Sequence, residues 1–304
     1  MAPGRVRKLL VKDLYVARDA TQHIAALIDK VRNGRLLSPE PCCILITGET
    51  GTGKSAFLAD YVKRSPARRD GSGNLVQPLL HVEFDSFVTV IGAATIMLRK
   101  LEDPSNGVGR LVDLTHRIRE LAKREKVEAI VIDEFQHLVD TGSKTVNKVG
   151  DWLKQLAKST NLPIVMAGMP ASSRVIDGNT QFAGITPYRH EIGMLTYGKD
   201  GERRQYRKFL ALLDSLLPFD HVGGFADAAI AALLFEATGG SLRMLMQLIR
   251  EAAGSAIDRN APSIGMPDLA FGFDQIEAMS PLTDNPFAAM GIMLPDHPGF
   301  SVAA

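Results

Sequence analysis

The sequence predicts an α/β fold in which a parallel β-sheet has helices on both faces, followed by a small C-terminal helical lid. Up to about residue 196, short apolar runs of strand character alternate with segments of helical periodicity, an order typical of parallel sheets. From Asp200 onward the helical periodicity continues without strands. A glycine-rich turn also joins the first apolar run directly to a helix. The functional prediction depends on this turn.

The composition indicates an ordinary globular protein without a strong overall charge. Of its 304 residues, 45% are hydrophobic and 23% are charged, and this length suggests one large domain and a smaller one. Lys and Arg number 35 against 34 for Asp and Glu, so a nucleic-acid contact would need a local basic patch. Residues 1–14 contain five charged side chains, and no uncharged apolar run approaches the roughly 18 residues of a membrane span. We therefore expect a cytoplasmic protein with no membrane partner.

Four segments are expected along the chain. Residues 1–38 form a lead helix and a linker, 39–196 form the α/β nucleotide-binding domain, and 197–260 form a lid of three helices. The remaining segment, 261–304, is rich in Pro, Gly and Met and has no long period. We expect this tail to be extended or partly disordered and to become ordered on a partner, because phenylalanines are scattered among its turn formers, at Phe271, Phe273, Phe287 and Phe300.

The first motif is I-L-I-T-G-E-T-G-T-G-K-S at residues 44–55. An apolar strand ends at Thr47, and the pattern G-x-x-x-x-G-K-[ST] then opens a helix, which is the context of a phosphate-binding loop. Its glycines let successive N–H groups point at a polyphosphate, and the helix N-terminus adds partial positive charge. Lys54 is expected to contact the β- and γ-phosphates, and Ser55 to bind Mg²⁺. The residues predicted to hold ATP are Gly48, Glu49, Thr50, Gly51, Thr52, Gly53, Lys54, Ser55 and Ala56.

The second motif is the apolar run at residues 129–132 followed by Asp133 and Glu134. In a protein with a phosphate-binding loop, the first carboxylate at the end of such a strand holds Mg²⁺. The second can orient or deprotonate the attacking water. Ligands of parallel sheets bind at the carboxyl ends of the strands, so both motifs should meet there. The two motifs together predict a nucleotide-binding protein that hydrolyses ATP.

A helix expected over residues 110–126 leaves two alternatives open. Its apolar stripe is flanked by basic side chains at Arg117, Arg119, Lys123 and Arg124. These residues form either a solvated helix face or a basic strip that follows a phosphate backbone. The sequence does not decide between the two.

The two motifs, together with a helical lid that begins Gly-Gly-Ser-Leu-Arg at 239–243, resemble AAA+ ATPases. The sequences V-I-D-E-F-Q-H-L at 131–138, D-W-L-K at 151–154 and L-P-I-V-M-A-G-M-P at 162–170 are similar to the TniB/TnsC-type ATPases of bacterial transposons. The resemblance spans about residues 21–259. It implies a regulator that assembles with ATP as a ring or helical filament on double-stranded DNA. It further implies recruitment of a DDE transposase and a TniQ-type target-selection partner, and disassembly on hydrolysis.

The resemblance also implies roles for arginines, and it includes two departures. Arg243 matches the residue that reaches from the lid to the γ-phosphate. AAA+ proteins usually carry a polar residue where this chain has Ala-Gly-Met at 167–169, so we expect slow hydrolysis. Family members place an arginine that enters a neighbour's nucleotide site shortly after a Gln-Leu-Ala-like sequence, but this chain has Gln-Phe-Ala-Gly-Ile at 181–185. The arginine is therefore displaced or lost, and Arg189, then Arg174, are the candidates.

Two other functions remain as alternatives. One is a helicase loader or remodeller acting on a protein or on single-stranded DNA. The other is a nucleotide-gated scaffold without hydrolysis, which the apolar strand end at 167–169 favours. A small-molecule kinase is a weaker alternative, because the sequence has no segment typical of a substrate-phosphate lid.

Overall fold

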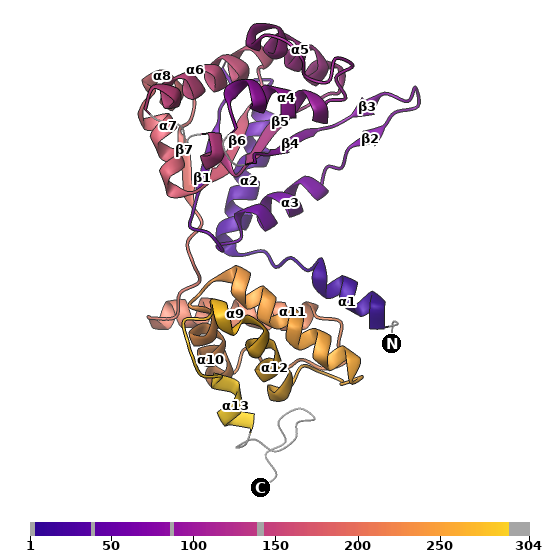
Figure 1. Cartoon of the computed structure of the whole chain (residues 1–304), viewed down its shortest axis with the longest axis vertical. Helices are drawn as coiled ribbons and strands as arrows, with labels where there is room; N and C mark the ends of the chain where they lie inside the picture. The colour runs from indigo at the N-terminus through magenta and orange to yellow at the C-terminus, as the bar shows by residue number, and fades with distance from the viewer. Residues whose placement is uncertain (1–3, 38–39, 86–87, 139–142, 292–304) are drawn as a thin grey trace. The chain divides into compact units, whose positions relative to one another are not determined.

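The computed structural model describes residues 4–37, 40–85, 88–138 and 143–291. The chain divides into two compact units (Figure 1). One is Asp19–Gly193, and the other consists of Met1–Arg18 together with Met194–Ala304. The first division falls after Arg18, inside the segment 1–38 that was expected to be continuous, because the first helix of the chain packs with the C-terminal helices.

The unit Asp19–Gly193, hereafter the α/β unit, is built on a five-stranded sheet. The strands are β1 Ile44–Thr47, β4 Leu79–Glu83, β5 Ala129–Asp133, β6 Ile164–Gly168 and β7 Tyr188–Glu191. Their spatial order is β4-β5-β6-β1-β7, and every neighbouring pair is parallel. The predicted parallel sheet is therefore confirmed, and the carboxyl ends of all five strands lie at one edge.

Strand side chains alternate between two buried layers. Leu45, Ile132 and Met166 belong to one apolar cluster with side chains of α4 (Val90–Lys100), α5 (Leu111–Arg124) and α6 (Ser143–Thr160). Ile46 and Val131, their strand neighbours, are fully buried outside that cluster, because successive strand residues point to opposite faces. The helices α2 (Asp19–Gly34) and α3 (Lys54–Lys63) lie on that second face, and α3 packs against β5 and β6 (Figure 1).

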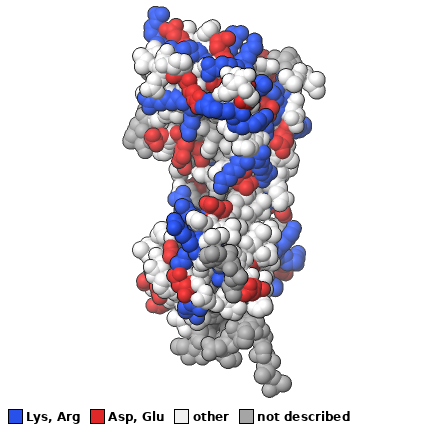
Figure 2. All heavy atoms as spheres, turned by 90° about the vertical axis from the view of Figure 1, so that its right-hand side faces the viewer, with Lys and Arg blue, Asp and Glu red and all other residues white. Residues whose placement is uncertain are grey.

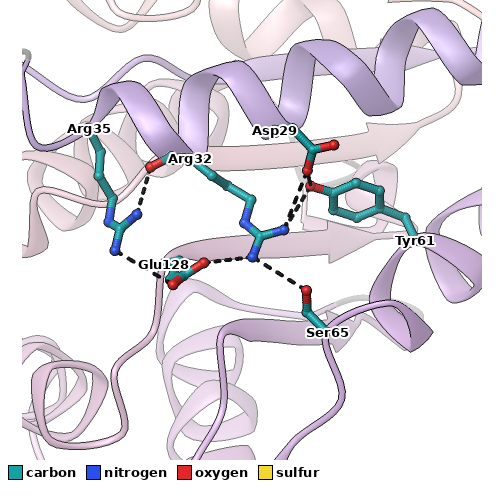
Figure 3. Close-up of polar contacts among 6 residues, drawn as sticks. All are labelled: Asp29, Arg32, Arg35, Tyr61, Ser65 and Glu128. Atoms are coloured by element: carbon teal, nitrogen blue, oxygen red, sulfur yellow. Dashed lines mark hydrogen bonds and ion pairs between the residues drawn. The ribbon is translucent and has the colours of Figure 1, made fainter.

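A polar network at the amino ends of the strands joins α2 to α3 and β5 (Figure 3). The Arg32 guanidinium donates to Glu128 Oε2 at 2.6 Å and to the Tyr61 hydroxyl at 3.0 Å. That hydroxyl in turn donates to Asp29 Oδ1 at 2.6 Å, and burial raises the pKa of Tyr61 to about 12. Glu128 directly precedes β5, so the network lies at the opposite edge of the sheet from the phosphate-binding loop.

Several short elements complete the α/β unit. Residues after α3 form a two-stranded antiparallel hairpin, β2 (Arg68–Arg69) with β3 (Leu75–Val76). Asp70 closes its turn by accepting the backbone N–H groups of Ser72 and Asn74. The helix α4 begins at Val90, where the Thr89 side chain caps it by accepting the Gly92 N–H. The remaining short helices are η1 Phe135–Leu138, η2 Pro170–Ser172, α7 Ser173–Asp177 and α8 Thr180–Gly184.

The second unit, hereafter the helical unit, is entirely helical in its described part. Its elements are α1 Gly4–Lys12, α9 Asp200–Leu216, α10 Ala228–Thr238, α11 Leu242–Asp258, α12 Met266–Ile276, η3 Glu277–Met279 and α13 Pro286–Gly291. The three predicted lid helices correspond to α9, α10 and α11. Arg7 of α1 is buried and donates to the Pro218 carbonyl at 2.8 Å, which fastens the first helix to the end of α9.

The expectation of an extended or disordered tail is wrong for residues 266–291. Phe273 and Phe287 are buried in the core of the helical unit, whereas Phe271 is 46% exposed and Phe300 lies outside the described residues. Gly272 allows α12 to approach α11 closely, because a Cβ at this position would lie 2.6 Å from the Leu248 carbonyl oxygen. The residues that suggested a broken tail are thus part of helix packing.

None of the described helices alone combines the length and the apolar character needed to cross a bilayer. Helices α10 and α11 meet these two criteria only together, as a pair bent by 115°.

Candidate nucleotide-binding site

The loop after β1 has the backbone conformation of a polyphosphate cradle. Gly51 and Gly53 adopt φ angles of 86° and 93°, in the left-handed region that favours glycine. A Cβ at Gly48 would lie 2.3 Å from the Ile192 carbonyl oxygen, so only glycine fits between β1 and the end of β7. Thr52 closes the loop by donating its hydroxyl to the Glu49 carbonyl at 2.9 Å. Three of the predicted residues therefore have a structural reason to be glycine.

Lys54 begins α3 with its ammonium group turned into the loop. The Lys54 Nζ donates to the carbonyl oxygens of Gly48 at 2.7 Å and Glu49 at 3.0 Å, and the side chain is buried. Glu49, Thr50, Ser55 and Ala56 are exposed. The structure thus brings the predicted ATP ligands together in one loop and the first turn of α3, with a cation at its centre. This arrangement fits the phosphates of a nucleotide.

Asp133, the last residue of β5, lies against the start of α3. The Ser55 side chain hydrogen-bonds to the Asp133 carboxyl group, whose pKa is nevertheless raised because burial disfavours its charged form. Asp133 is 3% exposed. Within the described residues, no group of three or more His, Cys, Asp and Glu side chains could hold a metal. One carboxylate and one hydroxyl fit Mg²⁺, which keeps several waters and binds nucleotide phosphates.

Glu134 follows at the strand end in an unusual conformation. Its φ is 52°, a left-handed value that is uncommon outside glycine and recurs at functional sites. Its N–H donates to Asp133 Oδ1 at 2.9 Å, and its carboxylate accepts a hydrogen bond from the Gln136 amide. The second predicted carboxylate is therefore at the same sheet edge as the loop and is held by a side chain to which the sequence analysis gave no role.

The end of β6 has the apolar sequence Ala167-Gly168-Met169, as the sequence indicated. The Gln136 Oε1 atom accepts the Met169 N–H at 3.1 Å. An amide from η1 therefore contacts the place where a polar strand-end residue was expected. Gln136 was not predicted from the sequence. The available signal was a polar residue three positions after Asp133, in the segment whose apolar residues Phe135 and Leu138 are buried in the core.

The arginine candidates lie in different units. Arg243 is exposed in the first turn of α11 in the helical unit, and its role toward a γ-phosphate stays a prediction. Arg189 lies on the edge strand β7, where its guanidinium pairs with Asp177 at 2.5 Å. Arg174 is exposed on α7. Both remain candidates for a group that enters a neighbouring protomer's site.

The basic face of α5 is partly occupied by internal contacts. Arg117 pairs with Asp103 at 3.2 Å and Arg124 with Glu125 at 2.8 Å. Arg119 and Lys123 instead line a cavity of about 350 Å³ together with Arg35 and Lys126. On the face drawn in Figure 2, Lys and Arg side chains gather over the α/β unit with Asp and Glu side chains among them. Arg119 also pairs with Glu120 at 3.7 Å. Of the predicted strip, the phosphate-backbone alternative therefore depends on Lys123, with Lys126 just beyond the end of α5.

Solved structures with a similar fold include ORC and Cdc6 proteins. The Aeropyrum pernix ORC2 protein matches with a TM-score of 0.65 and 14% identity, covering 90% of this chain and 72% of that chain. Cdc6p from Pyrobaculum aerophilum matches with a TM-score of 0.61 and 12% identity, covering 88% of this chain and 70% of that chain. The Aeropyrum pernix ORC1 protein in complex with DNA matches with a TM-score of 0.61 and 19% identity, covering 89% of this chain and 69% of that chain. At such identities the similarity shows the fold alone, which is that of an AAA+ P-loop NTPase.

Comparison of sequences gives the family. No curated protein matches the chain significantly. The family model described as "Bacterial TniB protein" matches residues 10–184, which include the phosphate-binding loop, Asp133, Glu134 and Gln136. Because the match covers more than half of the 304 residues, the chain belongs to the TniB family of AAA+ ATPases.

Proposed function

We propose that this protein is an ATP-dependent regulator of DNA transposition. It binds ATP and Mg²⁺ at the edge of the sheet where β1 and β5 end, and it assembles on double-stranded DNA in its ATP form. The assembly recruits a DDE transposase and a TniQ-type target-selection protein, and hydrolysis dismantles it. The observation that carries the proposal is the convergence of the cradle around Lys54 with Asp133 and Glu134 in a member of the TniB family.

The energetic basis is an ATP molecule placed between neighbouring protomers. If an arginine of one protomer approaches the γ-phosphate bound by the next, the phosphate charge stabilises the interface, and loss of that phosphate weakens it. Arg174 and Arg189 are exposed enough to act in this way, at an exposed position of α7 and on the edge strand β7. DNA would be held through phosphate contacts, which makes binding tolerant of sequence and strongly dependent on salt.

Electron microscopy tests the assembly. The protein with duplex DNA and a non-hydrolysable ATP analogue should form rings or filaments, and ADP or the Lys54→Ala variant should give none. Duplex DNA should also change the rate of ATP hydrolysis. The proposal would be contradicted if duplex DNA produced no oligomers and left the rate of ATP hydrolysis unchanged.

The two alternatives give different results in the same assays. A loader or remodeller would prefer single-stranded DNA or a protein cargo over duplex DNA. A scaffold without hydrolysis would turn over ATP no faster in its wild-type form than as the Glu134→Gln variant. The transposition regulator would be favoured if the protein preferred duplex DNA and if the wild-type protein hydrolysed ATP clearly faster than Glu134→Gln.

A further inference from the structure

The strand end that lacks a polar side chain of its own has one supplied from elsewhere in the chain. Gln136, three residues after Asp133, is 8% exposed and lies between Glu134 and the backbone of Met169. We propose that Gln136 is a positioning residue for Glu134, and that its amide replaces the polar residue absent from the end of β6. This inference rests on the proposed ATP hydrolysis.

The two contacts fix the orientation of the Gln136 amide. The Met169 N–H can only donate, so the atom that faces it must be the acceptor Oε1. The Nε2 group is then directed to the Glu134 carboxylate, which can only accept when ionised. Because each end of the amide has a partner of opposite character, the side chain has a single favourable orientation. Glu134 Oε2 is thereby tied to a strand of the sheet through one rigid group.

The shape of the strand end explains why its own residue is glycine. A Cβ at Gly168 would lie 2.8 Å from Gln136 Oε1 and 2.4 Å from Ser172 Oγ. Real Cβ atoms are not found so close to such atoms, so a side chain at position 168 would need both the glutamine amide and the Ser172 hydroxyl to move. The absence of a polar residue from β6 and the presence of Gln136 are therefore two aspects of one arrangement.

The arrangement matters for the hydrolytic step. In that step a water oxygen bonds to the γ-phosphorus, the bond from that phosphorus to the β–γ bridging oxygen breaks, and the water proton goes to a base, giving ADP and phosphate. A Glu134 carboxylate held through Oε2 presents Oε1 to the water in a fixed direction. Without the amide, the carboxylate can rotate about its side-chain torsions, and the geometry needed for proton transfer is populated less often.

The test compares two substitutions that disturb the amide with one that does not. Gln136→Met removes the amide at nearly constant size, and Gly168→Ala displaces it while leaving Gln136 in the chain. General bases contribute about 10²–10⁴-fold, so loss of positioning should lower kcat by about tenfold to a hundredfold in both variants, with KM and analogue affinity changed less than about twofold. Gln77→Met is the matched control, because Gln77 is a buried glutamine, 9% exposed, that donates to the Leu79 carbonyl at the amino end of β4, at the other edge of the sheet.

A double-mutant cycle separates positioning from a general structural role. If Gln136 acts through Glu134, adding Gln136→Met to Glu134→Gln should lower kcat by less than about twofold further. The inference would be overturned if the kcat losses of the two single variants multiplied in the double variant. It would also be overturned if Gln136→Met hydrolysed ATP as fast as the wild-type protein. A wild-type protein that turns over ATP no faster than Glu134→Gln would instead remove the proposed hydrolysis itself, and the inference with it. Retained analogue binding identifies the variants that are folded.

Discussion

Asp133 has an environment that favours its protonated form, and this has a consequence for metal binding. Burial raises the pKa of its carboxyl group, while Mg²⁺ requires the carboxylate. Protons should therefore compete with Mg²⁺ at a higher pH than for an ordinary aspartate, whose pKa is about 3.9. We expect Mg²⁺-dependent affinity for an ATP analogue to weaken as the pH is lowered from neutral, before Asp side chains in general titrate. Calorimetric titration at a series of pH values measures this.

The same shift affects stability in the nucleotide-free protein. A carboxyl group whose pKa is raised by folding stabilises the fold below its unfolded pKa, and this contribution is lost as the pH rises through the folded pKa. The ionised form of Asp133 is thus unfavourable in the nucleotide-free fold, and Asp133→Asn should raise the melting temperature without nucleotide while abolishing the stabilisation by Mg²⁺ and ATP. Asp113→Asn, at an exposed position of α5, should change neither the melting temperature without nucleotide nor the stabilisation by Mg²⁺ and ATP. A lower melting temperature for Asp133→Asn would contradict the assignment.

At the scale of elements, the network around Arg32 should stabilise the α/β unit without taking part in nucleotide binding. Arg32→Ala removes the donor to the Tyr61 hydroxyl and leaves Glu128 with only its longer ion pair to Arg35, at 3.9 Å. The free energy of unfolding should therefore fall by about 1–3 kcal/mol. Arg32→Lys should recover only part of this free energy, because an ammonium group lacks the two parallel N–H groups of a guanidinium that reach Glu128 and Tyr61 together.

Urea denaturation measures this loss. Arg64→Ala breaks a partly exposed pair between Arg64, which follows α3, and Asp60 in its last turn, and it should cost less than about 1 kcal/mol. Analogue binding at saturating concentration should survive in both variants, because the network and the phosphate-binding loop lie at opposite edges of the sheet. Loss of binding in a folded Arg32→Ala protein would show that the edges are coupled.

The C-terminal part of α5 gives a test of the two alternatives for its basic face. Lys123 and Lys126 line the same cavity and are exposed. If they contact DNA phosphates, the double variant Lys123→Gln/Lys126→Gln should reduce the slope of log K against log salt by about 0.9 per contact, or about 1.8 in total. Lys30→Gln/Lys63→Gln, on α2 and α3, provides the control. An unchanged slope in anisotropy titrations would favour the solvated helix face.

The sequence predicted those elements whose residues are buried in a regular pattern. The four apolar strands and their helices were recoverable because burial on both faces leaves continuous apolar runs. The strand β7 was missed, because Tyr-Arg-His-Glu at a sheet edge is only half buried. α12 was missed for a different reason. Pro267 stands in its first turn and Gly272 at a close helix contact, and both residue types otherwise suggest a break in a helix.

The candidate site divides in the same way. Gly48–Ser55 and Asp133–Glu134 were predictable because each is contiguous in sequence and has a chemical reason for its spacing. The contact of Gln136 with Met169 joins positions 33 residues apart, and no local pattern reports it. The absence of a polar residue at 167–169 was read from the sequence, whereas its physical reason, a space already filled by an amide from η1, needed three-dimensional coordinates.

At the scale of the whole molecule, the proposed assembly requires an arginine that acts on the nucleotide of another protomer. Arg189 is paired with Asp177, but an exposed pair contributes only about 0–1 kcal/mol, so the pairing does not prevent the guanidinium from leaving. An arginine supplied in this way contributes about 10³–10⁵ in kcat. We therefore expect Arg189→Ala or Arg174→Ala to lose DNA-dependent ATP hydrolysis while keeping nucleotide affinity.

Mixing two inactive proteins decides whether the arginine acts between protomers. Lys54→Ala protomers should bind no nucleotide yet retain both arginines, whereas the arginine variant retains a complete phosphate-binding loop. In a mixed assembly on duplex DNA, the intact arginine of one protomer can then reach ATP held by the other, so hydrolysis should reappear. An arginine that serves its own protomer cannot be supplied in this way, and the mixture would stay inactive. Arg64→Ala, which should be active alone, controls for a general effect of removing a surface arginine. If hydrolysis reappears in mixtures with neither the Arg189 nor the Arg174 variant, the role belongs to another residue.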